Sequence, residues 1–497
     1  MHQPLPPLIK ALLEPGRYPD PAQGVELIET HASWLLLAGE FAYKIKKPIT
    51  LPFLDYGTLE QRRACCETEL RLNRRFAPDL YLDVVAITGT PENPRFGGDG
   101  APIEFAVKMR RFAEAGRLDR VCARGELEPA HVSALADAVV AFHRDAAIAP
   151  VEARFGSPSE VLAPALENFE ELHSLLSDAE CRSKLDTLLA WTHAEFNRLA
   201  PHFAARKAAG QVRECHGDLH LGNLVLIDGR VTLFDCIEFN EDFRWIDVAS
   251  EIAFTYVDLL DHRQPGLAGW LLNEWLSRSG DYDAMPVLRF YAAYRALVRA
   301  KVAAIRAGQN QGDISETREY IALAEWLATP PKPRLIITHG LAGCGKTTAS
   351  TRLLQSDANA ATLRLRSDVE RKRLFGLAAA DKSHSPLDGG IYGQEAHLLT
   401  YRRLQDLAQG LLKAGWSVIV DAAFLKRAER ATFRALATQT GVEFRILAPQ
   451  SSPAQLRARI AARLGKGRDA SEATLEVLER QMALIEPLDA DERNCLL

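Results

Sequence analysis

The segment from Leu335 to Leu354 limits the possible folds of this 497-residue chain more than any other stretch. An apolar run, Leu335-Ile-Ile-Thr-His, leads directly into Gly340-Leu-Ala-Gly-Cys-Gly-Lys-Thr347, and a helical pattern follows from Thr348. The eight residues satisfy Gly-x-x-x-x-Gly-Lys-Ser/Thr, a pattern whose glycines let backbone amides close around phosphate between a strand and a helix. The sequence therefore predicts a strand, a phosphate-binding loop and a helix in this order.

The residues of this loop have separate expected roles toward a bound nucleotide. Lys346 neutralises the outer phosphates, and Thr347 can hold magnesium. Asp421 ends the apolar strand 417–421, where an acidic group can assist the same ion. We therefore expect ATP and Mg²⁺ as cofactors here. The complete predicted nucleotide-binding set of this loop is Gly340, Gly343, Gly345, Lys346, Thr347 and Thr348.

The surrounding sequence predicts a separate domain for this loop. Further strand-like segments at 361–367, 417–421 and 442–447 alternate with helices, which is typical of a parallel α/β sheet. Upstream, residues 328–334 contain three prolines in four positions, which cannot continue a helix or pair within a sheet. Because the chain is longer than one core usually fills, we expect domains at 1–328 and 333–497.

A second ordered set of polar residues lies in the first domain. Glu214-Cys-His-Gly-Asp-Leu-His-Leu-Gly-Asn223 is followed by a predicted hairpin around Asp228-Gly229 and then by Leu233-Phe-Asp235. Asp218 can accept a proton from an attacking hydroxyl, while Asn223 and Asp235 can hold the magnesium ions that bridge ATP phosphates. Turn chemistry explains each residue singly, but it does not explain the ordered set.

This stretch resembles the catalytic loop of aminoglycoside phosphotransferases, which carry His-Gly-Asp where protein kinases carry His-Arg-Asp. The resemblance implies a two-lobe, protein-kinase-like α+β fold, with a small lobe at about 20–112 and a large lobe at about 113–328. Within the small lobe it implies that Lys44 grips the ATP phosphates and that Glu69 pairs with this lysine. Lys46, on the same strand face, and Glu67 are the alternates.

Two further acidic positions follow the metal-binding Asp235 in this resemblance. Asp247 matches a residue that braces the catalytic loop, and by itself it would be a helix N-cap. Glu238 has a supporting role only. An isolated lysine-bearing edge strand, which would discourage aggregation, is the alternative for the segment around Lys44.

Arg366-Ser-Asp368-Val-Glu-Arg371 resembles the corresponding segment of small P-loop kinases related to polynucleotide kinase, gluconate kinase and zeta-type toxins. The resemblance implies that Asp368 activates an acceptor hydroxyl, that Arg371 binds an anionic substrate group and that Arg463 acts from a lid. A capped, solvated basic helix is the alternative for 366–373. Arg457, Arg459, Arg463 and Lys466 would form the lid, and the alternative for these arginines is simple exposure to solvent. The whole chain resembles proteins described as bifunctional aminoglycoside phosphotransferase and ATP-binding proteins.

The charge and composition of the chain limit the kinds of partner and compartment that we expect. The net charge of −5 argues against a general nucleic-acid-binding surface. The eight cysteines show no Cys-x-x-Cys spacing, so we expect reduced thiols in a cytoplasmic protein. No run approaches the roughly 20 apolar residues of a membrane span. Small-molecule hydroxyl substrates are the expected partners, and the sequence leaves the acceptors and the oligomeric state open.

These observations favour an ATP-dependent phosphotransferase with two nucleotide sites, which transfers the γ-phosphoryl group to hydroxyls of small molecules. Two alternatives stay open. One is a nucleic-acid 5′-hydroxyl kinase activity in the second domain, which would need a basic groove with stacking aromatics. The other is a nucleotide-sensing or toxin-neutralising module with only one catalytic site.

Overall fold

The computed structural model describes residues 4–20, 22–51, 54–310, 312–379, 381–383, 385, 389–466 and 474–497, without the side chains of 310 and 463–466. The chain forms two compact units, each assembled from several segments. The first contains Met1–Leu127, Ala141–Val161 and Ala204–Thr255, and the second contains Glu128–Val140, Leu162–Phe203 and Tyr256–Leu497.

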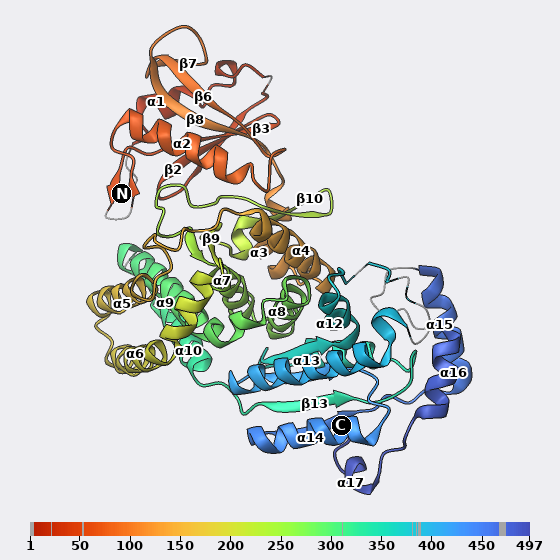
Figure 1. Cartoon of the computed structure of the whole chain (residues 1–497). Coiled ribbons are helices and arrows are strands. Elements are labelled where there is room, and N and C mark those ends of the chain that lie inside the picture. Colours follow the sequence, from red (N-terminus) through yellow and green to blue (C-terminus); the bar gives the residue numbers. More distant parts are fainter. Residues whose placement is uncertain are drawn as a thin grey trace. The chain divides into compact units, whose positions relative to one another are not determined.

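The first unit contains an antiparallel six-stranded sheet in the order β1-β2-β3-β8-β6-β7. Short turns connect its first three strands, so neighbours in sequence pair antiparallel. Helix α2 (Leu59–Asn73) packs on β8 and β6 (Figure 1) and begins with a capping box between Thr58 and Gln61. The strand bounds are β1 Val25–Glu29, β2 Ser33–Ala38, β3 Phe41–Lys46, β6 Tyr81–Thr90, β7 Asn93–Phe96 and β8 Pro102–Arg110.

The rest of this unit surrounds the predicted catalytic loop. β9 (Val212–Glu214) enters the loop and pairs with β12 (Trp245–Asp247), which leads out into α7 (Val248–Asp261). Between them lie the short helix η3 (Leu221–Asn223) and the hairpin of β10 (Leu224–Ile227) and β11 (Arg230–Leu233). The turn predicted at Asp228-Gly229 is confirmed, because both residues have positive φ, as a two-residue hairpin turn requires.

The second unit contains a parallel four-stranded sheet in the order β14-β15-β13-β16. Helices α13 (Gln394–Lys413) and α14 (Arg427–Thr440) both pack on β13 (Figure 1) and contact each other, with His397 of α13 bonded to Glu429 of α14 at 2.8 Å. β13 and β15 are buried apolar strands at the centre of the sheet, as their sequences predict. The strand bounds are β13 Arg334–Thr338, β14 Thr362–Arg366, β15 Ser417–Asp421 and β16 Glu443–Leu447. The predicted combination of a kinase-like fold and a parallel P-loop sheet is confirmed.

Helices make up most of the remaining chain. In the second unit, α8 (Pro265–Ser279) packs on α11 (Lys346–Gln355) and β14, and α9 (Met285–Asn310) packs on α10 (Ser315–Ala328). Within the described ranges, no helix combines the length and apolar character needed to cross a membrane. The other helices are α1 Pro7–Ala11, α3 Leu118–Ala123, α4 Pro129–Asp145, α5 Pro158–Leu175, α6 Ala179–Ala208, α12 Ser367–Leu374, α15 Pro453–Lys466, α16 Leu475–Leu484 and α17 Ala490–Arg493.

Candidate functional sites

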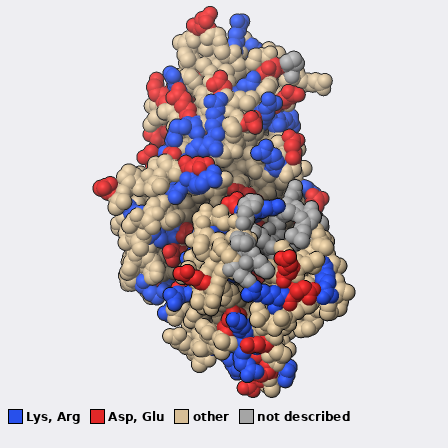
Figure 2. Space-filling view, turned by 45° about the vertical axis from the view of Figure 1, so that its right-hand side comes forward, with Lys and Arg blue, Asp and Glu red and all other residues tan. Residues whose placement is uncertain are grey.

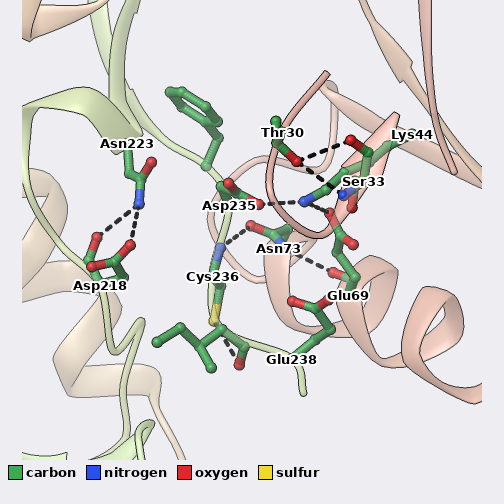
Figure 3. Close-up of polar contacts among 12 residues, drawn as sticks. Thr30, Ser33, Lys44, Glu69, Asn73, Asp218, Asn223, Asp235, Cys236 and Glu238 are labelled. Carbon is green, nitrogen blue, oxygen red and sulfur yellow. Dashed lines mark hydrogen bonds and ion pairs between the residues drawn. The ribbon is translucent and has the colours of Figure 1, made fainter. Parts of the chain in front are cut away.

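Lys44 lies at the centre of a charged cluster in the first unit (Figure 3). Its Nζ donates to Glu69 Oε1 at 2.9 Å and to Asp235 Oδ1 at 2.5 Å. Strand β3 supplies the lysine, α2 supplies Glu69, and the segment after β11 supplies Asp235. Burial opposes the charge on Lys44, but Asp235 and Glu69 outweigh that effect and raise its pKa well above the ordinary value. The predicted Lys44–Glu69 pair therefore forms and reaches the predicted metal-binding Asp235.

Lys46, the alternate lysine, faces the same carboxylate but a different environment. Its Nζ donates to Glu69 Oε2 at 2.7 Å and also pairs with Glu238. Tyr56 donates its hydroxyl to Glu238 and lies beneath the ammonium group, 4.8 Å from Nζ to the ring centroid. Only 1% of the Lys46 side chain is exposed, against 16% for Lys44. Lys46 is thus enclosed in the protein, whereas Lys44 reaches the exposed Asp235 carboxylate.

The predicted catalytic-loop residues Asp218 and Asn223 contact each other. Asn223 Nδ2 donates to the backbone oxygen of Asp218 at 2.9 Å and to its Oδ2 at 3.0 Å. In Figure 3, Asp235 lies between this pair and Lys44. His220 Nδ1 accepts the Gly222 N–H, so its Nε2 carries the proton and faces Asp218 Oδ2 at 3.4 Å. The loop therefore holds the Asp218 carboxylate from two sides.

His216 links the two halves of this site. Its Nδ1 accepts the Asp218 backbone N–H at 3.3 Å, and its Nε2 donates to the Phe234 carbonyl at 2.8 Å. Burial lowers its pKa, so the ring stays neutral, as this donor and acceptor pattern requires. Gly217 has φ +89°, and a Cβ there would lie 2.6 Å from the Phe243 carbonyl oxygen, so the residue between His216 and Asp218 must be glycine.

Glu251, which the sequence reasoning missed, braces the backbone of the catalytic loop. Its two carboxylate oxygens accept the N–H groups of His216 and Gly217 at 2.9 and 2.7 Å. Burial favours the neutral acid, but the hydrogen bonds from the His143 side chain and from the backbone N–H of His216 outweigh it and lower the pKa of Glu251 to about 2. The signal in the sequence was its position one helical turn after Asp247.

Asp247, to which the family resemblance gives a role in bracing the catalytic loop, contacts Arg206 and the first turn of α7. It accepts two hydrogen bonds from Arg206, each 2.7 Å long, and accepts the Ala249 N–H at 2.8 Å. It is therefore the N-terminal cap of α7 and a buried arginine partner. Helix α7 then presents Glu251 to the loop.

The oxygen atoms of Asn223 and Asp235 suit a divalent cation that prefers oxygen ligands. Asn223 uses its amide nitrogen for Asp218, which leaves its Oδ1 without a contact among the described residues. Asp235 gives one oxygen to Lys44, and 45% of its side chain is exposed. A carboxylate and an amide oxygen on neighbouring loops are ligands that Mg²⁺ accepts.

In the second unit, the predicted phosphate-binding loop has the required backbone form. Gly340, Gly343 and Gly345 all have positive φ, and a Cβ on Gly340 would lie 2.8 Å from Cys344 Sγ. Lys346, the first residue of α11, donates its Nζ to the carbonyls of Gly340 and Leu341 at 2.8 Å each. The loop therefore curls around the lysine at the N-terminus of α11, where backbone amides favour an anion. Thr347 and Thr348 are both exposed there.

Asp421 ends β15 beside this loop, as predicted, and its contacts extend the site. Ser350 donates its hydroxyl to Asp421 Oδ2 at 3.3 Å, and Arg364 donates to the same hydroxyl at 3.1 Å. Arg364 also donates to the Thr347 carbonyl at 3.3 Å, and burial lowers its pKa to about 10. Thr347 contributes its carbonyl rather than its hydroxyl to these contacts.

Helix α12 carries Asp368 and Arg371 and is largely buried, which excludes the solvated basic helix. Only 9% of Arg371 is exposed, and its guanidinium carbon lies 5.0 Å from the ring centroid of Tyr392. No carboxylate among the described residues pairs with Arg371, and its buried Nε has no hydrogen-bond partner there. Asp368 is half-buried and precedes Arg371 by three residues on α12, so both residues belong to one face of the helix. These two residues therefore lie near each other.

The structure describes the side chains of two of the three predicted lid arginines, Arg457 and Arg459. Arg463 belongs to α15, but its side chain lies outside the described residues. Arg459 donates to the Gly343 carbonyl at 3.2 Å and to Ser451 Oγ at 2.9 Å. Arg457 pairs instead with Glu479. Of the two lid arginines whose side chains are described, Arg459 is the one that contacts the phosphate-binding loop.

Two family models match separate parts of the chain. Residues 66–291 match the phosphotransferase enzyme family and residues 335–488 match an AAA domain. An uncharacterized protein of Mycobacterium tuberculosis is 29% identical over 466 residues, covering 92% of this chain and 90% of that protein.

Two solved structures give partial matches. A choline/ethanolamine kinase family protein from Mesorhizobium loti is 13% identical, with a TM-score of 0.42, over 65% of this chain and 94% of that one. A gluconokinase from Sinorhizobium meliloti is 17% identical, with a TM-score of 0.24, over 33% and 81%. The family matches and the two observed sheets show an N-terminal part similar to the phosphotransferase enzyme family and a C-terminal part similar to AAA domains, with a parallel P-loop kinase-like sheet.

Proposed function

We propose that this protein is an ATP-dependent phosphotransferase with two nucleotide sites, each transferring the γ-phosphoryl group of ATP to a small-molecule hydroxyl. The observation that carries the proposal is the contact of Lys44 with Asp235, 191 residues further along the chain, beside the Asp218–Asn223 pair. The functional domains proposed are residues 1–328 and 333–497.

In the first site, Asp218 orients the acceptor hydroxyl and takes its proton as the phosphoryl group is transferred. Asn223 Oδ1 and Asp235 would hold Mg²⁺, which neutralises the phosphate charge that develops during transfer. Lys44 binds the phosphates from the other side while Glu69 keeps it charged and oriented. Direct transfer needs this positioning and charge neutralisation, and it needs no nucleophilic side chain.

In the second site, Lys346 and the backbone amides of 340–348 bind the phosphates, and Thr347 and Asp421 would hold Mg²⁺. Asp368 serves as the base for the acceptor hydroxyl. The buried guanidinium of Arg371, which lacks a carboxylate partner among the described residues, favours an acceptor with an anionic group. Arg459 and Arg463 are the candidates for stabilising charge from the lid.

Small molecules are the proposed acceptors at both sites. Lysine and arginine side chains are interspersed with acidic ones on the face in Figure 2, and the net charge of the chain is −5. A nucleic-acid substrate would call for a continuous basic groove with stacking aromatics. These observations favour compact acceptors over polynucleotides.

The test is a screen of a metabolite extract by mass spectrometry for ATP-dependent gain of a phosphoryl group. Wild type, Asp218→Ala and Lys346→Ala are compared at equal concentration. We expect each substitution to remove a different product and to leave the other product in place. If both variants retain every product, the model of two catalytic sites is wrong.

A further inference from the structure

Strand β14 forms the edge of the parallel sheet, yet its outer side is hydrogen-bonded. Its inner side pairs with β15, with Arg364 opposite Ile419. On the outer side, Asn273 of α8 donates Nδ2 to the Thr362 carbonyl at 3.0 Å, and its Oδ1 accepts the Arg364 N–H at 2.6 Å. One side-chain amide thus takes the place of a neighbouring strand, and Asn273 is only 4% exposed.

The sequence of α8 permits this close approach. Gly266, Gly269 and Asn273 lie on one helix face, since their spacing is three and four residues. A Cβ on Gly266 would overlap the Gln355 carbonyl oxygen, and one on Gly269 would lie 3.4 Å from Ala360 Cα. Small residues on this face therefore bring the α8 backbone against the segment that leads into β14.

Just beyond α8, Tyr282 reaches the helix that carries the proposed acceptor site. Its hydroxyl donates to Glu370 Oε1 at 2.8 Å, and Glu370 is fully buried. Arg403 Nε donates to Glu370 Oε2 at 2.8 Å, and Arg373 also pairs with this carboxylate. Arg373 in turn donates to the Ser277 carbonyl at 2.7 Å. Two contacts thus join the C-terminal end of α8 and the following turn to α12.

The position of Glu370 on α12 makes these contacts important for Asp368. Residues two apart on an α-helix point to roughly opposite sides of the helix axis. Holding Glu370 therefore fixes the rotation of α12, and with it the direction in which Asp368 points. Arg371, the next residue, is fixed by the same constraint. The buried carboxylate acts as the anchor of the helix.

We propose that Asn273, Ser277 and Tyr282, which we name the α8 brace, position the acceptor side of the P-loop half. Asn273 fixes β14, and Tyr282 acts through Glu370 on α12. The brace comes from the helices of the predicted large lobe, so the second proposed site uses positioning residues from outside residues 333–497. This inference rests on the proposed phosphotransferase function of that half.

The proposal predicts that a change in the α8 brace weakens use of the acceptor but leaves nucleotide binding nearly unchanged. Tyr282→Phe removes one hydroxyl and leaves both arginines on Glu370, so the charge of the carboxylate stays paired. The probe is the metabolite-extract fraction that yields the Lys346-dependent product, titrated separately from ATP. In the full-length variant we expect about fivefold more extract to be needed for half-maximal rate. The KM for ATP and the affinity for a fluorescent ADP analogue should change less than about twofold.

The matched control is Tyr256→Phe, which removes a hydroxyl bonded to the Ala360 carbonyl at 3.4 Å and does not contact α12. This variant should leave both titrations unchanged. Equal losses for extract and ATP in Tyr282→Phe would indicate a general structural defect and would overturn the positioning role, as would no loss at all.

Hydrogen exchange measured by mass spectrometry separates this inference from the proposed function. We expect faster exchange in peptides covering 367–374 for Tyr282→Phe, and in peptides covering 362–366 for Asn273→Asp, with Tyr256→Phe like wild type. Unchanged exchange in both peptides would overturn the brace. Absence of any Lys346-dependent product would instead count against the catalytic proposal, while the exchange result still decides the brace.

Discussion

The two lysines of β3 show how neighbouring residues of one type can have different roles. Both contact Glu69, but only Lys44 also contacts the exposed Asp235. Lys46 is surrounded by Glu69, Glu238 and Tyr56 in the protein interior. We therefore assign phosphate binding to Lys44 and a structural role to Lys46.

Methionine substitutions should separate these roles. Lys44→Met should reduce formation of the Asp218-dependent product about 100-fold or more, because a preorganised charge at the phosphates is lost. Its fold should persist, since Lys46 still neutralises Glu69. Lys46→Met should lose about 3–5 kcal/mol of stability, because Glu238 is left buried without its lysine. Rate measurements and urea unfolding check both, and a stable, inactive Lys46→Met would reverse the assignment.

Glu69 should make the small lobe sensitive to acid. Burial alone would raise its pKa, but Lys44 and Lys46 lower it from 4.5 to about 2. A carboxyl whose pKa is lowered by folding stabilises the fold above its unfolded pKa, and that stabilisation is lost as pH falls toward the folded pKa. Between pH 4.5 and about 2, Glu69 therefore contributes a slope of up to about 1.4 kcal/mol per pH unit.

Glu69→Gln removes this titration, so the variant should lose stability less steeply than wild type between these pH values. Urea unfolding read by pulsed hydrogen exchange in peptides of α2 measures the slope within the lobe. The matched control is Glu67→Gln, which removes an exposed carboxylate on the same helix that pairs with Arg63. Equal slopes for wild type and Glu69→Gln would contradict the assigned pKa shift.

At the scale of elements, α7 connects two features that the sequence keeps apart. Asp247 caps its first turn and Glu251, one turn later, holds the backbone of the catalytic loop. Glu251→Gln presents an amide NH₂ to one of the two backbone N–H groups, so one hydrogen bond is replaced by a donor facing a donor. The loop that carries Asp218 should then shift.

A displacement of this kind should lower the rate of the Asp218-dependent reaction about 10- to 100-fold. Affinity for the fluorescent ADP analogue at the first site should change less than about threefold, because neither Lys44 nor Asp235 contacts Glu251. The comparison uses Lys346→Ala as the background, so that the second site does not bind. A variant with normal rate would show that the loop does not depend on this carboxylate.

The elements that could be predicted from the sequence are those with a signal in adjacent residues. The parallel strands and the phosphate-binding loop follow from apolar runs and from a motif whose residues are adjacent in the chain, and the hairpin follows from Asp228-Gly229. The role of Asn273 has no local signal, and the spacing of Glu251 from Asp247 marks a helix position without identifying what the carboxylate binds. Their partners become neighbours only through tertiary packing.

At the scale of the whole molecule, the compact units and the proposed functional domains divide the chain differently. The second unit combines the P-loop sheet with helices that precede the proline-rich segment, including α8, α9 and α10. The separation proposed at 328–333 describes sequence motifs, whereas the compact unit describes packing. Cutting the chain within this segment would separate Asn273 and Tyr282 from their partners on β14 and α12.

Because each proposed site has its own phosphate-binding lysine, bound nucleotide should protect two sets of segments from hydrogen exchange independently. At about 100 times Kd, a ligand that binds only the folded state stabilises its site by about 2.7 kcal/mol. With ADP and Mg²⁺ we expect slower hydrogen exchange around 41–46 and 218–235, and also around 340–350. Lys346→Ala should remove only the second set and Lys44→Met only the first, because each lysine contacts one site. Loss of both sets in either single variant would mean that nucleotide binding at one site depends on the other.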